Sequence, residues 1–100
     1  MTDRDPPANV QPALPLGHAD RGFRGLIQAI HVGEGMSDLA AGELENRLIE
    51  LGFVEGASVK ILHEGPFSGD PIAVRVDNAT IALRRREAMA ILVIGADPPP

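Results

Sequence analysis

Three histidines are the residues best suited to chemistry at neutral pH, because an imidazole can exchange protons or bind a metal ion near pH 7. His18, His31 and His63 fall in three separate segments of the chain, and no pair has the helical spacing of a metal-binding motif. A metal site would therefore have to form through folding, from His31 or His63 together with Glu64 or Asp70. The alternative is that all three are surface or strand-edge histidines.

Other catalytic patterns are missing from the sequence. The chain has no cysteine, which excludes thiol catalysis, thiolate metal sites and disulfide bonds. Ser37, Ser58 and Ser68 have no surroundings typical of an activated nucleophile. Carboxylates such as Glu43 and Glu50 lie on a predicted exposed helix and are typical of a solvated face. The sequence therefore predicts that the protein is not an enzyme.

The run Arg84, Arg85 and Arg86, followed by Glu87, is the main charged feature. One interpretation is a solvated turn in which one arginine is paired locally. The other is a docking patch for an acidic protein surface, because the planar guanidinium group binds carboxylates through two hydrogen bonds. A net charge of −5, with no Trp or Tyr and only three Phe, argues against nucleic acid as a partner.

Length and composition predict one small domain between two tails. The chain has 100 residues, which is room for one domain. Residues 1–22 are rich in proline and polar residues and are predicted to be a disordered tail. Residues 23–94 form the predicted domain, and residues 95–100, which end in three prolines, a second disordered tail. No apolar stretch is long enough to span a bilayer and no signal-peptide pattern is present, so we expect a cytoplasmic protein without membrane insertion.

The pattern of apolar residues predicts short strands around a single helix. Ile72, Val74 and Val76 alternate with more polar neighbours, as in a half-buried strand, and Gly52 is placed to end a helix. Five short strands without a strand–helix–strand rhythm predict a mainly β fold that closes into a small barrel, because closure removes exposed sheet edges. We expect strands at 23–32, 58–64, 72–76, 80–83 and 90–94, a helix from Ser37 or Asp38 to Leu51, and a helical turn at 84–88.

Several apolar side chains do not fit this inward alternation and give a second candidate surface. They are Leu62, Phe67, Leu92 and Ile94. Scattered apolar exposure is normal, whereas a contiguous patch would indicate a partner or self-association.

A set of short features between Arg47 and Val93 occurs in an order and spacing more specific than any one of them. They are Leu51-Gly52-Phe53, Gly56, Gly69-Asp70-Pro71, Ala82-Leu83-Arg84, Glu87-Ala88, Ile91 and Val93. In these features the segment resembles the FeoA family of small bacterial ferrous-iron-transport proteins. The resemblance implies an SH3-like barrel in the cytoplasm that docks on the cytoplasmic G domain of the transporter FeoB and modulates Fe(II) uptake.

We expect docking through Leu51, Phe53 and Phe67, near the helix end and the hairpin, together with the run from Arg84 to Arg86. Two alternatives remain open. A similar barrel is the C-terminal module of iron-dependent repressors, so the chain could be a regulatory module that acts with such a repressor. It could also be a weak Fe(II)-binding protein that uses His31, His63 and an acidic residue. No cofactor is expected other than this candidate Fe(II).

Overall fold

The computed structural model describes residues 12–37 and 39–96, and the predictions for residues 1–11 and 97–100 lie outside the described residues. The strands of this part form one antiparallel sheet in the order β1-β6-β2-β3-β4-β5. The elements are β1 (Leu14–Pro15), the 3-10 helix η1 (Leu16–His18), β2 (Arg24–Ile30), α1 (Ala41–Glu50), β3 (Ser58–Glu64), β4 (Ile72–Val76), β5 (Ala79–Leu83), α2 (Arg85–Ala88) and β6 (Ile91–Gly95).

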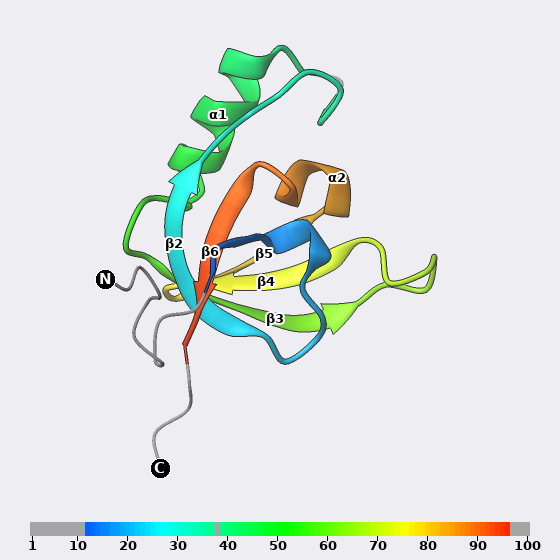
Figure 1. The fold of residues 1–100 in the computed structure, drawn as a ribbon. Coiled ribbons are helices and arrows are strands. Elements are labelled where there is room, and N and C mark those ends of the chain that lie inside the picture. Colours follow the sequence, from blue (N-terminus) through cyan, green and yellow to red (C-terminus); the bar gives the residue numbers. More distant parts are fainter. Residues whose placement is uncertain (1–11, 38, 97–100) are drawn as a thin grey trace, which may run out of the picture.

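The sheet is strongly curved, which confirms the predicted small mainly β barrel. Figure 1 shows β2 curving along one side of the molecule while β3 and β4 cross below, and α2 connects β5 to β6 at the upper right, below α1. Two register shifts contribute to the bending, one between Ile27 and Ala29 in β2 and one between Ile61 and His63 in β3. An extra residue in one strand of a pair bends that strand and increases its twist.

The core lies inside this curved sheet and follows the apolar alternation of the sequence. Ile72, Val74 and Val76 are at most 2% exposed, as predicted for one face of β4. Helix α1 contributes Leu44 and Leu48, which share a face because they lie four residues apart. The other fully buried large side chains are Leu16, Phe53, Ile27, Ile61, Leu83, Ile91 and Val93.

The domain begins earlier than predicted. Leu14–Pro15 pairs with β6, and the side chain of Leu16 is fully buried, so the predicted tail to residue 22 is wrong for the described residues from Leu14 onward. A strand of two residues is too short to show any period in the sequence, and proline is tolerated there because β1 is an edge strand. At the other end, Gly95 still belongs to β6 and Ala96 donates a main-chain hydrogen bond to β2.

Helix α1 begins later than predicted. The expected start at Ser37 or Asp38 is wrong, since the first helical residue is Ala41. The Ser37 hydroxyl accepts a hydrogen bond from the main-chain N–H of Leu39 at 3.1 Å. Such a local bond competes with helix formation. The helix end is as predicted, because Gly52 has a φ of +105°, the left-handed conformation that ends many helices.

We predict that Gly52→Ala lowers the free energy of unfolding by about 1–2 kcal/mol, because a Cβ atom disfavours the left-handed conformation. Gly42→Ala is the matched control. Gly42 lies in α1, where an added Cβ meets no atom within 4 Å. Since alanine favours helix over glycine, this substitution should leave the free energy unchanged or raise it by up to about 1 kcal/mol. Urea denaturation of both variants checks the prediction, and equal effects would contradict it.

Candidate interaction surface

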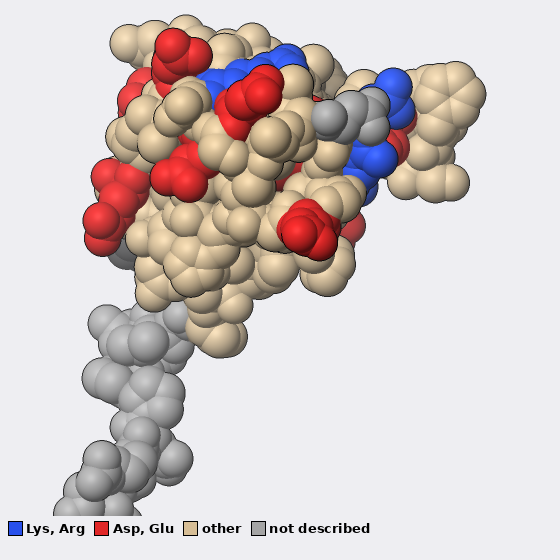
Figure 2. Space-filling model, turned by 90° about the horizontal axis from the view of Figure 1, so that it is seen from above, with Lys and Arg blue, Asp and Glu red and all other residues tan. Residues whose placement is uncertain are grey.

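Basic side chains gather on a protein that is acidic as a whole. Arg47 of α1 lines an open hollow together with Arg84 and Arg86, which flank the start of α2. Glu87 is the acidic residue among those that line it. Figure 2 shows one group of basic side chains close to the protruding loop between β3 and β4. The hollow therefore carries a local excess of positive charge, which suits an acidic surface.

The remaining lining residues of this hollow are uncharged. They are Ser37, Leu39, Pro71, Ala82 and Leu83. Sequence reasoning found Arg84 and Arg86 but missed Arg47. These residues are brought together only by the packing of α1 near the end of β5, and no spacing in the sequence indicates it.

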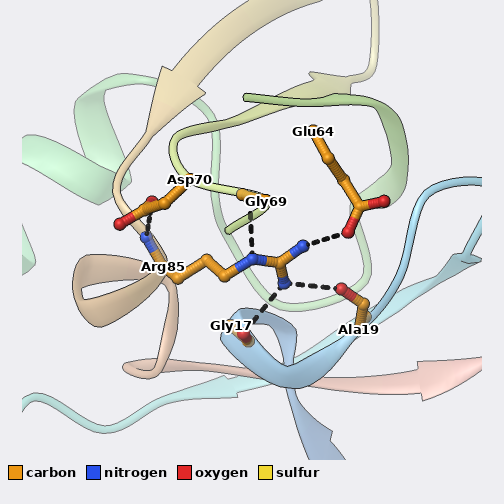
Figure 3. Close-up of polar contacts among 6 residues, drawn as sticks. All are labelled: Gly17, Ala19, Glu64, Gly69, Asp70 and Arg85. Atoms are coloured by element: carbon orange, nitrogen blue, oxygen red, sulfur yellow. Dashed lines mark hydrogen bonds and ion pairs between the residues drawn. The ribbon is translucent and has the colours of Figure 1, made fainter. Parts of the chain in front are cut away.

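Arg85, the middle arginine of the run, points away from the hollow and into the domain (Figure 3). Its side chain is 21% exposed. Its Nη1 donates hydrogen bonds to the main-chain oxygen atoms of Gly17, at 3.0 Å, and Ala19, at 2.7 Å. These two carbonyl groups belong to η1 and the residue that follows it. Arg85 therefore attaches the N-terminal segment to the rest of the domain.

The same arginine also holds the loop between β3 and β4. Its Nε donates a hydrogen bond to the oxygen of Gly69 at 2.8 Å, and its Nη2 forms an ion pair with Glu64 at 2.5 Å. The main-chain N–H of Arg85 donates to the Asp70 carboxylate at 2.8 Å. A planar guanidinium group can satisfy several acceptors at once because its five N–H groups point in fixed directions. Arg85 is thus engaged within the fold and is withdrawn from the set of docking residues.

The apolar docking residues predicted from sequence separate into an exposed, a half-buried and a buried side chain. Phe67, in the loop between β3 and β4, is 78% exposed. Leu51 is half-buried against the core, and Phe53 is fully buried, so the prediction that Phe53 contacts a partner is wrong. The chain folds back after α1, where the Phe53 N–H bonds to the oxygen of Leu48, and this turn directs the ring inward.

Sequence reasoning missed four exposed apolar side chains, Leu26, Leu39, Ile49 and Val54. Ile49 and Val54 are 44% and 42% exposed, and both line a depression between α1 and β2. Ile49 lies outside the apolar stripe of α1 and Val54 follows the helix, and neither position gives a signal beyond ordinary surface exposure. Of the other predicted outward side chains, Leu62, Leu92 and Ile94 are half-buried.

His31 and His63 do not come together. Gly22 donates a main-chain hydrogen bond to Ile61, so His63 lies beside the residues that precede β2, whereas His31 follows the other end of that strand. Seven strand residues separate the two ends by roughly 20 Å. Within residues 12–37 and 39–96, no three His, Cys, Asp or Glu residues are grouped so as to hold a metal ion. The described residues therefore do not form the site that was considered for Fe(II).

The curled sheet, the short helix between its last two strands in sequence and the single buried core define a small SH3-like barrel domain. Residues 14–94 match the FeoA domain, and the chain belongs to the FeoA family. The match begins at the first residue of β1, in agreement with the structural boundary. No helix in the described part of the chain is long and apolar enough to cross a membrane.

Solved structures of other FeoA proteins have the same fold. Iron(II) transport protein A from Clostridium thermocellum is 32% identical with a TM-score of 0.66, over 81% of this chain and 45% of that one. FeoA from Stenotrophomonas maltophilia, a prokaryotic SH3 domain protein solved in complex with zinc, is 29% identical with a TM-score of 0.63, over 78% and 86%.

The fold also occurs in metal-dependent repressors. A manganese-dependent transcriptional repressor is 27% identical with a TM-score of 0.68, over 86% of this chain and 43% of the repressor. A search of curated proteins found no match. The likeness to the repressor covers less than half of that protein, so it concerns one of its parts.

We predict that Arg85→Ala lowers the free energy of unfolding by about 2 kcal/mol or more. The substitution leaves the carbonyl groups of Gly17 and Ala19 without their donor, and partly buried acceptors that lose a partner are costly. Arg84→Ala is the matched control, because Arg84 is exposed, and its effect should stay within about 0.5 kcal/mol. Urea denaturation at low protein concentration measures both, and equal effects would contradict the role given to Arg85.

Proposed function

We propose that this FeoA-family domain is a protein-interaction module that docks on the cytoplasmic G domain of the ferrous iron transporter FeoB and modulates Fe(II) uptake. The observation that carries the proposal is the FeoA match over residues 14–94. The domain works in the cytoplasm on this proposal, beside the part of the transporter that it contacts.

The exposed side chains support a binding role. Phe67 is 78% exposed at the tip of a loop, and Asp70 joins this loop to α2 through the main-chain N–H of Arg85. Arg84 and Arg86, on the same part of the fold, are exposed. An exposed aromatic side chain near arginines is the composition that protein interfaces favour. We therefore assign docking to Phe67, Arg84 and Arg86, with Leu51 as a half-buried neighbour.

Binding of the full-length chain to the purified cytoplasmic G domain of FeoB from the same organism tests the proposal. Titration calorimetry without nucleotide, with GDP and with a GTP analogue should give saturable binding in at least one of these states. Absence of binding in all of them, together with unchanged ferrous uptake after removal of the gene, would overturn the proposal.

Phe67→Ala should weaken this binding by at least about tenfold, because a truncated aromatic contact at the centre of an interface costs more than 1 kcal/mol. Val54→Ala is the matched control, since Val54 is also exposed but lies in the turn after α1, away from the Phe67 loop in Figure 1. The control should bind like the natural chain. Equal affinities for all three proteins would place the docking surface elsewhere.

A second candidate function follows from the likeness to the manganese-dependent repressor. On this alternative the domain acts with an iron-dependent transcriptional repressor encoded in the same organism. The same calorimetric experiment with the purified metal-loaded repressor distinguishes the two, because each function requires binding to one partner and not to the other.

A further inference from the structure

Strand β5 lies at one edge of the sheet and pairs with β4 alone within the described residues. Its five residues, Ala79–Leu83, contain neither a charged side chain nor a proline. Proteins usually protect a sheet edge with such residues, because unpaired main-chain groups attract another strand. The edge of β5 is therefore open to pairing.

The hydrogen bonds of β4 show which of its residues direct their main-chain N–H and C=O groups toward β5. Asp77 donates its main-chain N–H to the oxygen of Ser58, at the start of β3, at 3.2 Å. Successive residues of an antiparallel strand direct their main-chain groups to opposite sides. The N–H and C=O groups of Arg75 therefore also face β3, and those of Val74 and Val76 face β5.

The main-chain groups of β5 follow from this alternation. Its residues opposite Val74 and Val76 are Ile81 and Ala79, and these bond back to β4. Thr80 and Ala82 therefore direct their N–H and C=O groups away from the sheet. Both residues are exposed, and neither forms a hydrogen bond to another element of the described chain. Two donors and two acceptors are thus available along this edge.

We propose that this edge binds a second copy of the chain, so that β5 pairs antiparallel with β5 of the other copy in a two-fold symmetric dimer. With Ile81 at the symmetry axis, Thr80 of each copy lies opposite Ala82 of the other. This register pairs every outward N–H with an outward C=O and forms four hydrogen bonds. The interface contacts the same residues on both copies, as a two-fold axis requires.

Charge at the two ends of β5 favours a second copy over an arbitrary strand. In the same register, Asn78 of one copy lies opposite Arg84 of the other, and the adjacent turn residue Asp77 comes within reach of that arginine at both ends of the paired strands. Asp77 is exposed at the turn between β4 and β5. The hollow beside Ala82 carries Arg47 and Arg84 among its lining residues. Each copy thus presents the Asp77 carboxylate at one end of β5, where the Arg75 side chain bonds to the Asp77 main-chain oxygen, and a basic hollow at the other.

Sedimentation velocity of the full-length chain, from about 10 μM to about 1 mM, tests the dimer. The mass should rise with concentration from 10.6 kDa toward twice that value. Thr80→Pro should stay monomeric throughout, because it removes an outward donor without removing a hydrogen bond to β4. A natural chain that stays monomeric would overturn the proposal, as would a folded Thr80→Pro protein with unchanged dimerisation.

Asp77→Asn provides a second measurement if the proline variant fails to fold. Asparagine tolerates the positive φ of 51° at this position, so the turn is kept while the charge is removed. Loss of two exposed ion pairs should raise the dimer dissociation constant about fivefold. Glu45→Gln, which removes an exposed carboxylate on α1 beside β2, should have no effect, and equal effects of both variants would overturn the proposal. Neither variant changes Phe67, so the result is independent of docking on the transporter.

Discussion

The hydrogen bonds of the Arg85 side chain are the contact on which the organisation of this domain depends. One guanidinium group binds carbonyl oxygens before β2 and in the loop between β3 and β4, and pairs with a carboxylate at the end of β3. These segments do not pair with one another as strands. Because a single charged group satisfies all of them, the N-terminal segment, the protruding loop and α2 hold fixed positions. The exposed Phe67 and the basic hollow are presented by the parts that Arg85 joins.

The predictions that were confirmed depend on neighbours in sequence. Alternation between Ile72 and Val76 predicted β4, and Gly52 predicted the end of α1. Both could be predicted because the face of a strand and the left-handed conformation of a glycine depend on residues adjacent in sequence. The pairing of Leu14–Pro15 with β6 could not be predicted in this way. It depends on partners almost eighty residues distant, and its two residues carry no pattern of their own.

The same difference between local and long-range properties explains which predictions for the candidate site were right. Three successive arginines have the same chemistry in the sequence, but the first turn of α2 sends Arg85 inward while Arg84 and Arg86 are exposed. Phe53 was assigned to the surface for its proximity to a helix end, although that helix end is what turns it into the core. A surface is thus defined by which side chains the fold leaves outside, and residue type alone does not decide this.

Pairing between β1 and β6 has a consequence for how the protein is made. These strands lie near opposite ends of the chain, with Leu14 opposite Val93. While the chain is being synthesised, β1 and β2 emerge long before β6, yet β6 fills the place between them. Closing so long a loop is costly in chain entropy and slows folding. The first strands therefore keep one side unpaired until β6 has been synthesised.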